Sequence, residues 1–254
     1  MKKLLRISAL LILLLLTLFF TFNASPSMSR QDEVYIKAFI HDWKMADVCD
    51  SCHRNFQTEI NFISTIQDSV VGNIRHEQVS FSKAGDVKFY YENRKGFCFD
   101  RALLLELFYK YYGFKVRHAF IYYHTDSTAT GNLDFLDPKI YSHAMLEIKT
   151  VRGWMAVGTN HCWLGIDKDG KLLDLEKIRA ELKATGTLAL AKNSEEGQPF
   201  FTSLPLHSNF KFIYGLYSRH GKFLQSVPVE KWMKAAGLRT HIPDYNIRSL
   251  MYNF

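Results

Sequence analysis

The sequence predicts an α+β domain, from the order of its segments and from its composition. Two helical patterns come first, and segments with the alternation of antiparallel strands follow them. Of the 254 residues, 47% are hydrophobic and 15% aromatic, which excludes a disordered chain. Four cysteines are too few for a fold built on disulfides. We expect a single domain over residues 30–254, with its core at about residues 80–170, behind an N-terminal leader.

The leader, residues 1–24, has the composition of an export signal. Lys2, Lys3 and Arg6 precede an uncharged, mostly apolar run at residues 7–22. As a helix, such a leader would reach roughly 28 Å, close to the hydrocarbon thickness of a bilayer, about 30 Å. An uncleaved anchor and a cleaved signal peptide both remain open. Because the basic end stays inside, we expect a single-pass protein of a bacterial-type inner membrane, with its domain on the periplasmic or extracellular side, or a secreted domain if the leader is cleaved.

The formal net charge of +7 does not indicate a nucleic-acid partner. It comes from 32 basic and 25 acidic residues, and three of the basic residues lie in the leader. The remaining 29 basic residues leave the domain a net charge of only +4, and they are scattered along the chain. We therefore expect no nucleic-acid binding.

Two helices are predicted in the first half of the domain. The first covers residues 55–76, where apolar side chains recur at helical spacing. These are Phe56, Ile60, Ile63, Ile66 and Val70. The second covers residues 97–112 and ends at Gly113, a residue typical of helix C-termini.

Strands dominate the next part of the chain. Residues 115–124 are rich in strand-forming residues, and residues 141–149 and 154–160 alternate as strands do. A two-residue hairpin loop at Val151 and Arg152 would pair residue 150 with 153, and therefore His143 with Asn160. We further expect a short helix at 175–182, a strand at 209–217 and a helix at 229–237.

Cys98 and His143 are the candidates for nucleophile and base. Cys98 stands at the start of the second predicted helix, where the helix dipole and free backbone N–H groups are expected to lower the pKa of a thiol. A thiolate nucleophile also needs a proton carrier, and His143 begins a strand whose apolar alternate positions face the other way.

Three short motifs, in this order, resemble the transglutaminase-like thiol superfamily. They are Gly96-Phe97-Cys98 at a helix start, Ser142-His143-Ala144 with Glu147, and Gly153-Trp154. The resemblance implies a papain-like α+β core in which the nucleophile helix packs on an antiparallel sheet. It also implies a site of Cys, His and Asp, with Cys98 as nucleophile and His143 as base.

The third residue of that site departs from the family pattern. The family has Asp four residues after the Trp, and here that position is Gly158. Asn160 lies opposite His143 in the predicted hairpin, so its amide oxygen is the candidate that orients the imidazole. Asp167 or Glu147 are alternatives. A register shifted by one residue would instead place Thr159 opposite the histidine.

The resemblance implies an enzyme acting on amide or peptide bonds of a peptide or protein, by acyl transfer or hydrolysis through a thioester on Cys98. No cofactor is required. Loss of the family Asp leaves open a catalytically inactive binding or scaffold domain.

The segment Cys49-Asp50-Ser51-Cys52-His53 is a second motif, and its pattern is that of c-type haem attachment. A disulfide is the commoner state of such cysteines in an oxidising compartment, with Cys162 as a further candidate partner. A zinc site that adds His161 or Cys162 is a third alternative.

Overall fold

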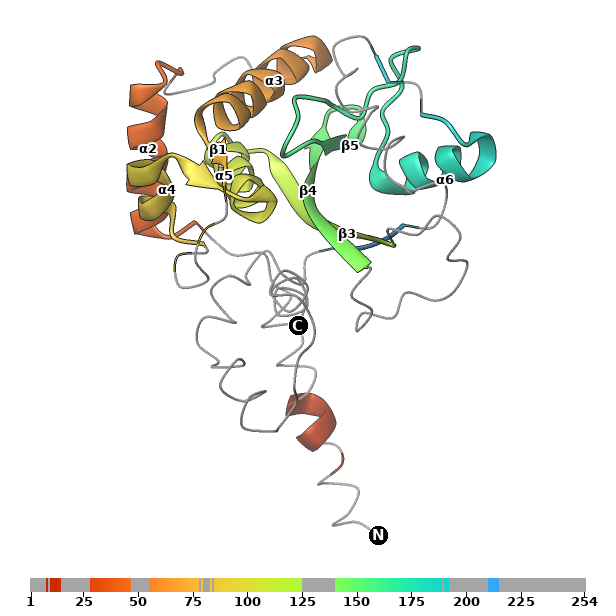
Figure 1. The fold of residues 1–254 in the computed structure, drawn as a ribbon, viewed down its shortest axis with the longest axis horizontal. Helices are drawn as coiled ribbons and strands as arrows, with labels where there is room; N and C mark the ends of the chain where they lie inside the picture. Colours follow the sequence, from red (N-terminus) through yellow and green to blue (C-terminus); the bar gives the residue numbers. More distant parts are fainter. Residues whose placement is uncertain are drawn as a thin grey trace.

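The computed structural model describes residues 8, 10–14, 28–46, 55–77, 79, 83, 85–124, 140–188, 190–191 and 210–214. A four-stranded sheet separates a layer of helices from one further helix, α6 (Figure 1). This arrangement confirms the predicted α+β class.

The helical layer contains α2 (Arg30–Asp42), α3 (Phe56–Asn73), α4 (Val87–Asn93) and α5 (Cys98–Tyr111). Helix α5 is the innermost, because every residue from Cys98 to Tyr109 is buried. Its apolar residues lie on all sides, a pattern that suits a helix enclosed by the core. Helices α3 and α5 correspond to the two helices predicted at residues 55–76 and 97–112.

Helices α2 and α4 were not predicted. The start of α2 carries a capping box, in which Ser29 and Asp32 each accept the backbone N–H of the other at 3.1 Å. Arg94 follows α4 with a φ of 50° and places its guanidinium 4.7 Å from the ring of Phe39 and 4.6 Å from that of Tyr91. The capping box is a local pattern, whereas the contact between Arg94 and Phe39 joins segments that are distant in sequence and has no local signal.

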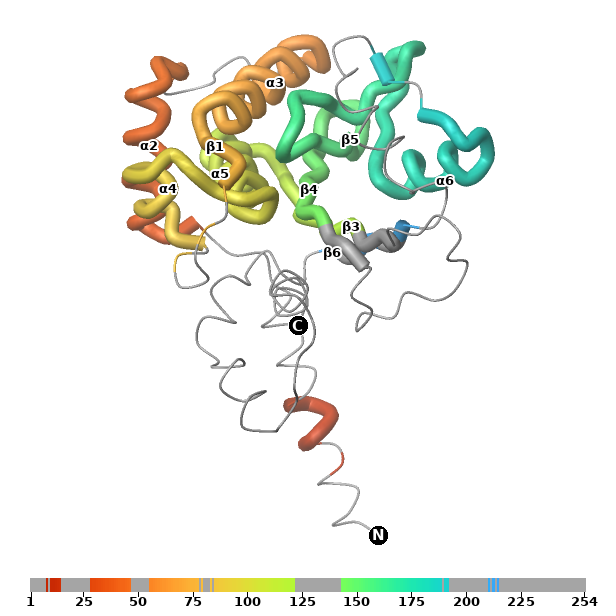
Figure 2. The backbone as a smooth tube through the Cα atoms, in the orientation of Figure 1, coloured from red at the N-terminus to blue at the C-terminus, as the bar shows by residue number. Residues whose placement is uncertain are grey.

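The sheet consists of β3 (Lys115–His124), β4 (Ile140–Thr150), β5 (Gly153–Val157) and β6 (Lys211–Tyr214), and a separate parallel pair is β1 (Arg75–His76) with β2 (Lys95–Gly96). The order is β5-β4-β3-β6, antiparallel throughout, and Figure 2 shows β6 beside β3. The predicted hairpin register is confirmed, because Thr150 pairs with Gly153. Strand β5, however, ends at Val157 rather than at residue 160.

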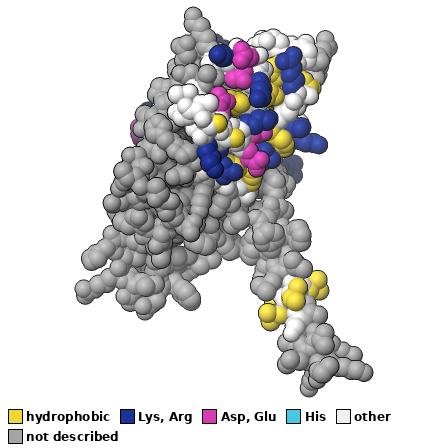
Figure 3. Space-filling model, turned by 90° about the vertical axis from the view of Figure 1, so that its right-hand side faces the viewer, with side chains coloured by type: hydrophobic (Ala, Val, Ile, Leu, Met, Phe, Trp, Pro, Cys, Tyr) yellow, Lys and Arg dark blue, Asp and Glu magenta, His cyan; other side chains and the backbone are white. Residues whose placement is uncertain are grey.

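Both faces of this sheet are buried, in two separate clusters. On one face, Leu146 and Ile148 of β4 pack with the helical layer. On the other face, Met145 packs with Ile178 and Leu182 of α6 (Leu175–Thr185). The apolar residues therefore fill both alternations of β4. On the outer face seen in Figure 3, Lys and Arg side chains are interspersed with Asp and Glu over the described residues.

Several predicted features fall outside the described residues. They include most of the leader, the helix predicted at 229–237, and the motif with Cys49, Cys52 and His53. Residues 10–14 of the leader are helical. Among the helices that the structure describes, none combines the length and the apolar character needed to cross a membrane.

Candidate functional site

Cys98 is the first residue of α5, and a tight approach of the chain fixes this helix start. A Cβ at Gly96 would lie 2.7 Å from the Cβ of Asp100, so a side chain there would force the two segments apart. Asp100 accepts the backbone N–H of Phe97 at 2.8 Å and also accepts the hydroxyl of Tyr90. The buried carboxylate therefore caps the helix in the turn that holds the thiol.

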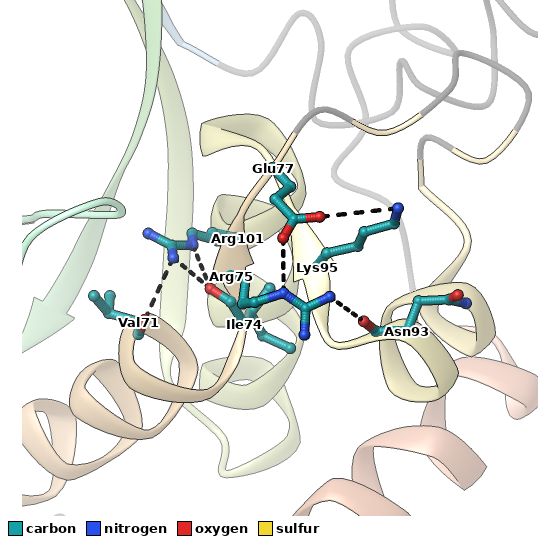
Figure 4. A network of polar contacts seen from close by, with 7 residues as sticks. All are labelled: Val71, Ile74, Arg75, Glu77, Asn93, Lys95 and Arg101. Carbon is teal, nitrogen blue, oxygen red and sulfur yellow. Dashed lines mark hydrogen bonds and ion pairs between the residues drawn. The ribbon is translucent and has the colours of Figure 1, made fainter.

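Arg101 ties the start of α5 to the end of α3 (Figure 4). Its guanidinium donates to the carbonyl of Ile74 through Nε at 3.0 Å and approaches the carbonyl of Val71 at 3.4 Å. A cation is favourable here because the C-terminal end of a helix is its negative end. Beside this contact, ion pairs join β1 and β2 through Arg75, Glu77 and Lys95.

The edge of β4 at Ala144 is where the candidate residues meet. Leu146 pairs with Val157, the last residue of β5, and the same register places Thr159 opposite Ala144. Thr159 reaches this position with its side chain, since its hydroxyl donates to the carbonyl of Ala144 at 2.6 Å. The backbone N–H of Ala144 faces the sulfur of Cys98. The thiol and the hydroxyl thus both lie beside the backbone of Ala144.

His143 approaches the same hydroxyl. Its Nε2 lies 3.3 Å from Oγ1 of Thr159, and the ring is buried with 7% of the residue exposed. Because the hydroxyl proton is directed at the carbonyl of Ala144, the hydroxyl oxygen acts as acceptor toward the ring. This geometry assigns the proton of the neutral imidazole to Nε2 and leaves a lone pair on Nδ1, as a general base requires.

Burial reverses the electrostatic expectation for the thiol. It raises the pKa of Cys98 to about 11, and the charge of Asp100 adds to the rise, although the N–H groups of Ala144, Phe99 and Cys98 itself act in the opposite direction. The helix start was expected to lower this pKa. The expectation is wrong because loss of water around the sulfur destabilises the thiolate by more than the backbone N–H groups stabilise it.

The imidazole is kept neutral by the same cause. Burial lowers the pKa of His143 to about 3, and the nearby imidazoles of His76 and His161 lower it further. His76 is placed by β1 and stacks on the ring of Phe97, with ring centroids 4.6 Å apart. The resting site therefore contains a thiol and a neutral imidazole.

Asn160 does not take the role expected of it. Its Oδ1 is buried and has no hydrogen-bond partner in the described part of the chain. The hairpin register is as predicted, but the strand stops three residues before Asn160, and the chain then folds back toward Trp163. In consequence Thr159, rather than Asn160, supplies the oxygen next to His143.

Gly158 has no room for the family's Asp. A Cβ at this position would lie 2.5 Å from the carbonyl oxygen of His161 and 2.6 Å from Nε1 of Trp163. The indole is buried and fills the space that a side chain would enter. The packing of Trp163 therefore leaves no space for an Asp side chain at position 158.

The two alternative carboxylates have other partners. Glu147 is buried on the α6 side, where it pairs with Arg117 and accepts the backbone N–H of Leu175 at 2.7 Å. Asp167 accepts the backbone N–H of Lys171 at 2.8 Å in a turn. Neither is described next to His143.

Cys162 and His161, the candidates for a zinc site, lie in the segment between Gly158 and Trp163. Over the described residues, no group of three or more His, Cys, Asp or Glu side chains is arranged to hold a metal ion. The remaining candidate ligands, at residues 49, 52 and 53, lie outside the described residues.

Comparison with protein families matches residues 46–159 to the transglutaminase-like superfamily core. The chain contains a transglutaminase-like domain. The matched segment includes Cys98, His143 and Gly158 and ends at Thr159. The matched segment thus covers α3, α4, α5 and strands β1 to β5. Helix α5, which begins at Cys98, packs on the antiparallel sheet, as expected. Neither the curated proteins nor the solved structures give a match.

Proposed function

We propose that this domain is a thiol enzyme that cleaves or transfers the acyl group of amide or peptide bonds, with Cys98 as nucleophile and His143 as general base. One observation carries the proposal. The sulfur of Cys98 and the hydroxyl of Thr159 meet at the backbone of Ala144, and that hydroxyl also contacts Nε2 of His143. Thr159 would therefore orient the base in place of the family's Asp.

The proposed chemistry has two steps. The sulfur of Cys98 bonds to the carbonyl carbon of the substrate, and the thiol proton passes to Nδ1 of His143. The C–N bond then breaks, and the imidazolium gives this proton to the leaving amine, which yields a thioester. Water or a second amine attacks the thioester, with His143 accepting its proton, and the thiol is regenerated. The backbone N–H of Cys98, at the helix start, is the proposed donor to the oxyanion.

The resting charge state makes a definite prediction about pH. Burial raises the pKa of Asp100, in the same helix turn, to about 6. With the pKa of Cys98 raised to about 11 and that of His143 lowered to about 3, the neutral pair and an ionised Asp100 persist from about pH 7 to about pH 9. Attack assisted by a neutral imidazole is then independent of pH in this range. Attack by free thiolate instead rises about tenfold for each pH unit below the thiol pKa.

The test is acylation of the full-length protein by p-nitrophenyl acetate, followed by the mass of the peptide that contains Cys98. The proposal expects a flat pH profile for the wild type. H143A should react about 100-fold more slowly at pH 7 and rise tenfold per pH unit. C98A supplies the background. If the wild type is acylated at the same rate as H143A, with the same dependence on pH, the proposed enzyme activity is refuted.

That outcome would instead favour the second candidate function, a non-catalytic binding or scaffold module. Gly158 supports this alternative, because the family's Asp is missing and its space is filled by Trp163. Thr159 stabilises an imidazolium less than a carboxylate would. The slope of the pH profile separates the two functions, since a scaffold needs no base.

We also propose that the domain works outside the inner membrane on a peptide or protein amide. The basic residues and apolar run of the leader support this location. Digestion of the full chain by protease added to intact spheroplasts is the expected result. Protection of the domain until the cells are lysed would contradict it.

A further inference from the structure

Gln67, on α3, reaches the chain segment that carries Thr159. Only 1% of this residue is exposed. Its Nε2 donates to the carbonyl of Gly158 at 2.8 Å and to that of Trp163 at 2.9 Å, and it lies 3.4 Å from the carbonyl of His161. One carboxamide on α3 thus contacts both ends of the segment at residues 158–163, across more than ninety positions of sequence.

This segment is a closed loop. The N–H of Gly158 donates to the carbonyl of Trp163 at 3.0 Å, and the N–H of Trp163 donates to the carbonyl of His161 at 3.0 Å. The carbonyl of Trp163 therefore accepts from both Gly158 and Gln67. Since the contacts with the carbonyls of Gly158 and Trp163 are buried, the two protons of the Gln67 amide satisfy groups whose burial would otherwise be unfavourable.

We infer that Gln67 is a positioning residue for the thiol site. By holding the loop at residues 158–163 against α3, it keeps the hydroxyl of Thr159 between the carbonyl of Ala144 and Nε2 of His143. Gln67 affects the reaction indirectly, by determining which ring nitrogen of His143 carries the proton. This inference rests on the proposed function for its kinetic part, whereas the tautomer can be measured without any activity.

Helix α3 also offers a matched control. Glu59 is buried, with 3% exposed, and accepts the backbone N–H of Val151 at 2.8 Å. Glu59 therefore binds the backbone of the β4–β5 turn, whereas Gln67 binds the backbone of the loop that follows β5. Both side chains come from one helix and bond to backbone, but only Gln67 acts next to Thr159.

The experiment compares the full-length variants Q67M and E59M, in which a side chain of similar length lacks the polar end. Three quantities are measured: the free energy of unfolding, the protonation of each ring nitrogen of His143 by nitrogen NMR, and the rate of acylation of Cys98 by p-nitrophenyl acetate at pH 7. We expect both variants to lose stability. Q67M alone should shift the His143 proton partly from Nε2 to Nδ1 and slow acylation about tenfold.

A wild-type tautomer in folded Q67M would overturn the inference, as would an equal tautomer shift in E59M. If Q67M does not fold, Q67L replaces it, since this apolar side chain of similar branched shape has no donor for the loop carbonyls and adds no buried charge. If the wild type shows no acylation by Cys98, the proposed function fails, and the NMR comparison still decides the role of Gln67.

Discussion

Two threonines at opposite ends of the β4–β5 hairpin make the same kind of contact and have different consequences. Thr150, at the turn, donates to the carbonyl of Gly153 at 3.0 Å and accepts the N–H of Arg152 at 3.2 Å. Thr159, past the other end of β5, donates to the carbonyl of Ala144 at 2.6 Å and contacts Nε2 of His143. In each case the hydroxyl bridges a carbonyl and an N–H group.

The difference lies in what surrounds the two hydroxyls. The partners of Thr150 lie within three residues of it, so the turn is a local structure. The partners of Thr159 lie fifteen and sixteen residues away, and its loop is held by Gln67 from another helix. A hydroxyl bridge thus stabilises a turn at one end, whereas at the other it connects the base to the strand edge where the thiol lies.

The largest effect is expected at Gly158. G158D, which restores the family's residue type, should lower the free energy of unfolding by about 3 kcal/mol, because the new side chain meets the indole of Trp163 and the carbonyl of His161. It should slow rather than accelerate acylation of Cys98. Urea unfolding and the acylation rate measure both effects. A more active and equally stable variant would contradict the described packing.

Gly72 provides the control for this substitution. It lies in α3, and a Cβ there would meet nothing within 4 Å. G72A should therefore leave the stability unchanged or raise it by up to about 1 kcal/mol, because Ala is favoured over Gly in a helix.

T159V should have the next largest effect, and mainly on the reaction. Removal of the hydroxyl leaves Nε2 of His143 without the oxygen described next to it, and we expect acylation of Cys98 to slow about 30-fold, which corresponds to about 2 kcal/mol. T159S keeps the hydroxyl and should retain most of the rate. N160A tests the residue expected from the hairpin register. If N160A slows the reaction as much as T159V does, Thr159 is not the residue that orients the imidazole.

T150V should affect stability alone. Its hydroxyl bonds to backbone groups of the turn, and their loss is expected to cost about 1 kcal/mol of unfolding free energy. The pH profile of Cys98 acylation should match that of the wild type. A change in that profile would show that the two ends of the hairpin are coupled, and it would remove the distinction between the two threonines.

The smallest effect is expected at Arg152, in the same turn. Its guanidinium lies 4.2 Å from the ring centroid of Phe56 at the start of α3. R152A should lower the free energy of unfolding by about 0.5 kcal/mol, the usual size of such an exposed contact. Thermal unfolding in matched buffers measures this difference in stability. A loss of unfolding free energy several times larger would show that the contact between Arg152 and Phe56 is essential for packing of the turn on α3.

Local patterns in the sequence were sufficient for much of the fold. The spacing of apolar residues predicted α3, and Gly113 marked the end of α5. The two-residue turn predicted the register of β4 and β5 correctly, because turn length fixes which residues pair. These features depend on residues close together in the chain. Helix α2 also has a local signal, the capping box at Ser29.

The sequence by itself determined that Cys98 begins a helix, that His143 lies on a neighbouring strand, and that the register brings Thr159 and Asn160 to this region. Only the tertiary structure decided which of the two residues reaches the imidazole. Packing of Trp163 against Gly158 and the hydrogen bonds from Gln67 end the strand early, and both depend on contacts between distant segments. The direction of the thiol pKa was decided in the same way, because burial depends on the whole fold and the helix start does not.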